Sequence, residues 1–371
     1  MGPPGSPPRA GPVIYPAVLS GLLRAGLVAV LIGFPAARAA AEDAPKPAGD
    51  APKEETSLPK FRFEVVLHDY EPLTDRSTRV AELFWAGVKA DFTRGIVSAL
   101  AEVRGTEGRF RPYFAGSVWL EEGWAGVKTP AGTARLGKIV PDVGLADDSF
   151  SGTLFSYNGV TRNPGWGAQL AGEAPNGADA LAWSAAWTGQ NDHVSWEEDG
   201  RDVESDPDRV LRDGLSARVS YFWNNVIWSL KPAFSAATAR LVAREGPDEF
   251  RRTDLAADLT ATLGPLAVFA EGFWRSGRSC VPDVPCRYGY DDSHAVLLGI
   301  RAEFPTVTYR YSWSRWHYVG ADAVEELHLP GAVWTPVKGI SASIEYSARS
   351  LRTLAGTTTI KAFQLGLTVF F

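Results

Sequence analysis

Phe363-Gln364-Leu365-Gly366-Leu367-Thr368-Val369-Phe370-Phe371 are the last nine residues of this 371-residue chain. Apolar side chains fill every odd position of the stretch, and mostly polar or small ones fill the even positions. Because successive side chains of a strand point to opposite faces, the stretch predicts a strand with one strongly apolar face. At the end of a soluble domain such a strand would leave an edge that invites aggregation. A closed barrel in a membrane removes that edge and places the apolar face against lipid.

The same alternation recurs from residue 61 onward. Three further apolar sets are Phe61, Phe63, Val65 and Leu67; Val307, Tyr309, Tyr311 and Trp313; and Ile340, Ala342, Ile344 and Tyr346. Short breaks, such as Gly264-Pro265, alternate with long polar ones, which is typical of short periplasmic turns and long extracellular loops. We count sixteen segments, including a weakly patterned one near 323–330 that precedes a tight turn between Pro330 and Pro336.

The predicted fold class is therefore all-β, a 16-stranded antiparallel transmembrane β-barrel with its last strand closed against residues 61–68. One missed hairpin would make the strand number 14 or 18. The alternative is a soluble sandwich or propeller, which seldom needs many outward tryptophans. Twelve of the thirteen tryptophans lie outside the acidic loop that contains Trp196. Indole rings prefer membrane interfaces. Those placed near predicted strand ends are Trp85, Trp187, Trp223, Trp274 and Trp313.

The N-terminal region has the features of an export signal. Arg9 and Arg24 precede an apolar stretch, 25–37, that is followed by small residues and is too short to span a bilayer. We expect a signal peptide at 1–41 with cleavage near 39–41, a flexible periplasmic lead-in at 42–60, and the barrel at 61–371; an uncleaved anchor is the alternative. Cleavage changes the formal charge from −6 to −9, which gives no support to nucleic-acid binding.

The two cysteines of the chain, Cys280 and Cys286, lie in the stretch Cys-Val-Pro-Asp-Val-Pro-Cys. In an exported protein this spacing favours a local disulfide. A metal site is the alternative, but it would need four ligands, and only Asp283, Asp291 and Asp292 lie nearby. The sequence therefore predicts a disulfide, and neither a metal nor a cofactor.

Two resemblances narrow the class. The terminal strand resembles that of Gram-negative outer-membrane barrels, whose assembly machinery recognises a final phenylalanine, here Phe371. Residues 119–127, followed by Leu136-Gly137-Lys138 and Pro141, resemble the hairpin of phosphate-selective porins O and P, and residues 162–172 resemble an Arg-x-x-Gly strand of that family. This resemblance implies a homotrimer with an inward-folded third loop, here 140–162.

An inward loop brings charges into a narrow lumen, where fields are focused. The candidate pore-lining and constriction residues are Arg62, Glu64, Asp142, Asp147, Asp148, Arg218, Asp258, Glu271, Arg275, Arg301 and Arg310. Lys138 is a weaker candidate because it shares parity with Leu136. The alternative, which the mixture of charges favours, is that each is a solvated wall residue of a wide aqueous lumen. Since acidic and basic residues are mixed, the phosphate selectivity of the family is not carried over.

The function predicted is a porin, a channel in the outer membrane for passive diffusion of small hydrophilic solutes or ions, with anions as one option. The expected partners are outer-membrane lipid and lipopolysaccharide, the barrel-assembly machinery, two further copies of the chain and small solutes. The alternative is an anchor or adhesin acting through loops such as the acidic one at 192–213. A hydrolase is a weaker alternative, because none of the five histidines lies in a recognisable catalytic motif. The chain is therefore not expected to be an enzyme.

Overall fold

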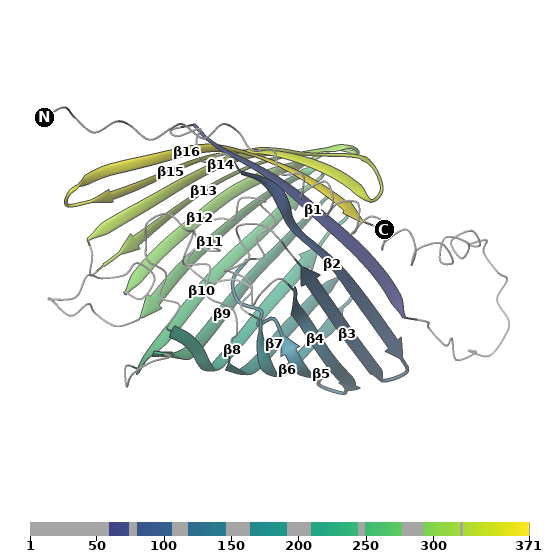
Figure 1. The fold of residues 1–371 in the computed structure, drawn as a ribbon. Coiled ribbons are helices and arrows are strands. Elements are labelled where there is room, and N and C mark those ends of the chain that lie inside the picture. The colour runs from purple at the N-terminus through teal and green to yellow at the C-terminus, as the bar shows by residue number, and fades with distance from the viewer. Residues whose placement is uncertain are drawn as a thin grey trace, which may run out of the picture. The chain divides into compact units, whose positions relative to one another are not determined.

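A computed structural model describes residues 59–73, 80–105, 118–145, 164–190, 209–243, 249–276, 292–319 and 322–370. These residues form a closed antiparallel barrel of sixteen strands, which confirms the predicted class and strand number (Figure 1). The signal peptide expected at 1–41 and most of the lead-in expected at 42–60 lie outside the described residues. Among the described residues, no helix is long and apolar enough to cross a membrane.

Each strand pairs with its neighbours in sequence, and β1 pairs with β16. The strands are β1 (Lys60–Pro72), β2 (Val80–Arg94), β3 (Val97–Gly105), β4 (Val118–Thr129), β5 (Gly132–Ile139), β6 (Gly165–Asn176), β7 (Asp179–Gln190), β8 (Arg209–Asn224), β9 (Trp228–Ala243), β10 (Glu249–Leu263), β11 (Leu266–Ser276), β12 (Ser293–Glu303), β13 (Val307–Tyr318), β14 (Ala323–Val337), β15 (Ile340–Thr353) and β16 (Gly356–Phe370).

The last strand closes on the first as predicted, although it pairs with residues 64–72 and so only partly with the expected 61–68. Val66 lies opposite Thr368 and Val65 lies opposite Val369, so β16 closes the barrel on β1, the yellow and purple strands of Figure 1. Leu365 is 47% exposed on the outside, whereas its neighbour Gln364 is 6% exposed on the inside. The barrel therefore carries its apolar side chains outward, the reverse of a soluble core.

The weakly patterned segment is a full strand, but the tight turn expected between Pro330 and Pro336 is wrong. β14 runs through both prolines to Val337, and the turn lies at residues 338–339. Proline has no N–H for a strand ladder. Pro330 accordingly has no partner on β15, and the register shifts between Trp334 and Val337, next to Pro336. Irregular pairing on one side of β14 accommodates the prolines within the strand.

Ser343 and Ile344 are adjacent on β15 and test which face meets lipid. Ser343 shares parity with the buried Glu345, whereas Ile344 is exposed on the outer face. We expect Ile344→Lys to lower the free energy of unfolding in lipid vesicles by about 2 kcal/mol or more, because it places a charge against lipid. Ser343→Lys should change it by less than about 1 kcal/mol. Urea titration of both variants measures the difference, and equal losses would contradict the assignment of faces.

Candidate functional site

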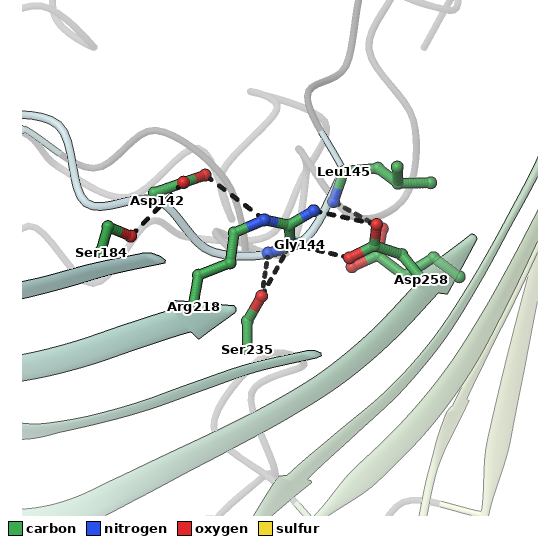
Figure 2. A network of polar contacts seen from close by, with 8 residues as sticks. Asp142, Gly144, Leu145, Ser184, Arg218, Ser235 and Asp258 are labelled. Atoms are coloured by element: carbon green, nitrogen blue, oxygen red, sulfur yellow. Dashed lines mark hydrogen bonds and ion pairs between the residues drawn. The ribbon is translucent and has the colours of Figure 1, made fainter. Parts of the chain in front are cut away.

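The chain turns into the barrel directly after β5. Residues 140–145, which we call the inner segment, reach strands far from β5 around the wall (Figure 2). The N–H of Gly144 donates to Ser235 Oγ on β9 at 3.1 Å. The N–H of Leu145 donates to Glu271 Oε2 on β11 at 3.2 Å. The inward fold implied for loop 140–162 is thus seen for residues 140–145, and the remainder lies outside the described residues.

One guanidinium fastens the inner segment to the wall. Arg218 on β8 donates two hydrogen bonds to Asp258 on β10, at 2.7 and 2.9 Å, and a third to Ser235 Oγ at 2.7 Å. Its Nε lies 3.7 Å from Asp142 Oδ1 of the inner segment. Ser184 Oγ on β7 donates to Asp142 at 3.4 Å (Figure 2). Bidentate charge-assisted bonds fix the direction of a guanidinium. Arg218 therefore links three strands to the segment.

Gly144 is required where the segment meets the wall. Its φ is +68°, a conformation that other residues rarely adopt, and a Cβ there would lie 2.4 Å from Glu271 Oε1. A larger residue would meet both backbone strain and the carboxylate that holds Leu145. The close approach of the segment to β11 depends on this glycine.

An apolar cluster on the inner wall supports the same segment. Its members come from β10 to β14 and pack against the side chain of Leu145; they are Ala256, Phe273, Ala295, Leu297, Trp316, Tyr318, Ala323, Leu327 and Leu329. Sequence reasoning missed this cluster because barrel interiors are expected to be polar. The parity of Phe273, which it shares with Glu271 and Arg275, was the available signal. The segment is thus held by polar bonds and by apolar packing.

Two pockets flank the inner segment. The β5–β8 pocket, about 420 Å³, is lined by Arg135, Gln169, Ser184, Arg218 and residues 140–145, among others. The β1–β4 pocket is about 280 Å³. It is lined by Arg62, Glu64, Trp85, Gly87, Val88, Lys89, Glu102, Arg104, Glu121, Glu122 and Val140. Val140 lines both pockets, so the start of the inner segment borders each of them.

The β1–β4 pocket carries a chain of ion pairs. Glu102 accepts from Lys89 at 3.2 Å and from Arg104 Nε at 2.7 Å, and Arg104 also lies 3.2 Å from Glu121. A register shift between Glu102 and Val103 in the pairing with β4 is a bulge, and a bulge can turn two consecutive side chains toward one face. Glu121 and Glu122 consequently both line the pocket.

The prediction that Trp85 lies on the outer face near the membrane interface is wrong. Trp85 does not join an outer aromatic girdle, because it lines the β1–β4 pocket with Arg104 stacked 4.2 Å from its ring centroid. The pairing of β2 with β1 skips one residue between Leu83 and Trp85, and such a bulge reverses the alternation. Trp187, Trp223 and Trp274 are exposed on the outer face as expected.

Two groups of the predicted site residues lie at the inner segment or in the β1–β4 pocket. Asp142, Arg218, Asp258 and Glu271 meet at the inner segment. Arg62 and Glu64 line the β1–β4 pocket.

The other arginines are paired with carboxylates on the wall. Arg275 is fully buried and pairs with Asp254 at 2.9 Å, Arg301 pairs with Glu303 at 2.7 Å, and Arg310 pairs with Glu345. Lys138, expected with the outward Leu136, is instead buried and donates to the carbonyl of Leu120 at 2.7 Å. Asp147, Asp148, Cys280, Cys286 and Phe371 lie outside the described residues.

Sequence reasoning missed several charged residues that the pockets contain. Those residues are Lys89, Glu102, Arg104, Glu121, Glu122 and Arg135. Their strand parity could have placed most of them on the inner face, but the bulge in β4 hides the inward position of one of the two adjacent glutamates.

No protein-family model and no curated protein matches the chain. Solved structures of outer-membrane proteins share its fold at low identity. The anion-selective porin of Comamonas acidovorans is 12% identical with a TM-score of 0.58, over 85% of this chain and 99% of the porin. The outer membrane channel DcaP of Acinetobacter baumannii is 13% identical with a TM-score of 0.56, over 84% and 97%. OmpT of Vibrio cholerae, solved in a trimer form, is 13% identical with a TM-score of 0.56, over 85% and 99%.

The fold is therefore that of Gram-negative outer-membrane porins. The likeness is to the barrel, and the resemblance to the phosphate-selective porins O and P gains no further support from these comparisons.

The variant Asp258→Asn tests whether the Arg218–Asp258 ion pair, which holds the inner segment to the wall, stabilises the barrel. The side chains of Arg218 and Asp258 are 9% and 1% exposed, so Asp258→Asn leaves a buried guanidinium whose remaining ion pair is with the exposed Asp142. We expect a loss of about 3 kcal/mol in the free energy of unfolding, measured by urea titration in lipid vesicles. The matched control is Asp213→Asn, which removes the partner of Arg240 from a pair whose side chains are 46% and 43% exposed. That change should cost less than about 1 kcal/mol. Equal losses in the free energy of unfolding for the two variants would contradict the assignment of Arg218 and Asp258 as a buried ion pair.

Proposed function

We propose that this protein is an outer-membrane porin whose barrel is a water-filled channel for passive diffusion of small hydrophilic solutes. A barrel of this strand number is wide enough to enclose an aqueous lumen. The observation that carries the proposal is the inner segment, held inside the barrel by Arg218 and bordered by two pockets that contain charged side chains. A segment fastened in this way narrows a lumen without filling it, which favours a channel over an anchor.

The remaining parts of the proposal follow from membrane residence. The outer face, with its exposed apolar and tryptophan side chains, would contact lipid and lipopolysaccharide, and the terminal Phe371 would serve the barrel-assembly machinery. The trimer form of Vibrio cholerae OmpT supports a homotrimer for this chain. The N-terminal 41 residues would direct export. We propose no catalytic role, because most of the described inner charges are engaged in ion pairs that hold the wall and the inner segment.

The polar groups of the lumen favour weak ion selectivity. Arg218, Arg275 and Arg310 are each paired with a carboxylate, and the β1–β4 pocket sets three cationic side chains against four carboxylates. A strongly anion-selective pore would need an excess of basic side chains. The resemblance to phosphate-selective porins is therefore a resemblance of sequence motifs, and we do not propose phosphate selectivity for this protein.

Planar-bilayer recording tests the channel and the role of the inner segment together. The purified protein should give discrete current steps. Gly144→Ala should increase the fluctuation of the open-channel current by about twofold or more, because the segment loses its fixed contact with β11. Gly95→Ala is the matched control, since Gly95 also has a positive φ, +59°, but lies in a turn with open space around it.

Two results would contradict the proposal in different ways. Absence of current from the wild-type protein would exclude the channel and favour the anchor alternative. Equal current fluctuation in the two glycine variants would show that the inner segment lies outside the path of the ions.

Ion preference is predicted from the same charges. In a KCl gradient the reversal potential should correspond to a permeability ratio of anions to cations within about threefold of unity. The measurement is the zero-current potential of many channels in one bilayer. A ratio far above this range would show that basic side chains elsewhere in the chain dominate the lumen.

A further inference from the structure

The β1–β4 pocket contains three charged residues outside its ion-pair chain, and one of them, Glu122, accepts a hydrogen bond from Trp124 Nε1 at 2.8 Å. Among the residues that the structure describes, no hydrogen bond or ion pair joins Arg62 or Glu64 to another side chain. Lys89, Glu102, Arg104 and Glu121, by contrast, form one connected chain of pairs along the wall. Arg62 and Glu64 are therefore the two charged lining residues that neither an ion pair nor a side-chain hydrogen bond engages.

The two charges stand side by side on one face of β1. They are two residues apart, so their Cα atoms are about 7 Å apart and both side chains point inward. Arg62 lies opposite Lys89 across the pairing with β2, which places two cations together. Glu64 lies opposite Gly87, where the Arg104 side chain and the Trp85 ring occupy the space of a missing side chain, each 3.1 Å from an ideal Cβ position. The pocket thus offers a cationic end next to an anionic end.

The surroundings of Glu64 keep the two ends distinct. Arg104 lies across Gly87 from Glu64, but its charge is already shared between Glu102 and Glu121. Trp85 covers one side of Arg104, 4.2 Å from ring centroid to guanidinium, and holds it against the wall. Consequently Arg104 is positioned by partners other than Glu64, and the Glu64 carboxylate faces the pocket.

The charge balance of the pocket decides which solutes it suits. An anion such as phosphate would meet four carboxylates, and a simple cation would meet Arg62, Lys89 and Arg104. A solute that carries both charges meets an opposite charge at each end. A volume of about 280 Å³ has room for such a molecule of amino-acid size with water.

We propose that the β1–β4 pocket is a recognition site for small zwitterions of the amino-acid class, with the solute carboxylate at Arg62 and Lys89 and its ammonium group at Glu64. This inference rests on the proposed channel function and names the solute class that the channel favours. The site speeds passage by replacing part of the hydration shell of both charged groups within the narrowed lumen. Weak, paired contacts suit transport because the solute must also leave.

Swelling of liposomes that contain the purified full-length protein tests the proposal. The probes are L-serine, a zwitterion, and erythritol, an uncharged molecule of similar size, each supplied alone. Because neither probe has a net charge, a change in the mean potential of the pore does not by itself change the ratio of their rates. The wild-type protein should pass serine faster than erythritol, after subtraction of the rates of protein-free liposomes.

Arg62→Gln and Glu64→Gln should each lower the serine-to-erythritol ratio by about threefold, the effect of losing one solvated charge contact, while the erythritol rate stays unchanged. The exchanged double variant Arg62→Glu with Glu64→Arg should recover part of the ratio, since both charges are again present. Arg301→Gln is the matched control, because Arg301 and Glu303 have the same spacing on one strand but pair with each other at 2.7 Å. That variant should leave the ratio unchanged.

Other outcomes overturn the inference and separate it from the channel itself. An unchanged ratio in both pocket variants, with normal erythritol rates, would refute the zwitterion site and leave the channel standing. An equal fall in Arg301→Gln would also refute it, because the effect would belong to lumenal charge in general. Failure of the wild-type protein to pass either probe would refute the channel and the site together. Arg62→Lys, which keeps the charge, should retain most of the ratio, and its failure with a folded barrel would count against the proposal.

Discussion

The constraint on which this structure depends is that a chain crossing lipid as strands must pair its backbone N–H and C=O groups within the protein. β1 and β16 satisfy it by joining each other, so the sheet has no free edge. Closure at this strand number leaves a wide interior, into which the inner segment folds. The inner segment can stay there only because the wall binds it, through Ser235 at Gly144 and through Glu271 at Leu145.

The contacts of the inner segment are arranged on one side of the barrel. Arg218, Asp258, Ser235 and Glu271 belong to consecutive strands from β8 to β11, and the apolar cluster continues the same wall to β14. Burial of the Arg218–Asp258 pair makes the arrangement costly to break, because either charge left alone would remain poorly solvated. The β1–β4 wall instead keeps its charged side chains along a pocket, which Arg62 and Glu64 also line.

The fold was largely accessible from the sequence because its signals are local. Alternation in stretches such as 363–371 and 340–346 identifies strands and their outer faces, and turn residues such as Gly264 and Pro265 separate them. The site was harder to predict from the sequence, because it depends on how the strands are aligned with one another. Arg218 and Asp258 are 40 residues apart, and nothing local says that they meet. Single-residue bulges in β2 and β4 changed which face Trp85 and Glu121 occupy, and the missing N–H of Pro330 was accommodated within a strand where a turn was expected.

Val140 is a wall shared by two compartments. Because Arg218 lies 3.7 Å from Asp142, two residues after Val140, the position of Val140 depends on that contact. In the proposed channel, a change at Arg218 would therefore alter the linings of both pockets in one variant, although Arg218 itself lines only one of them.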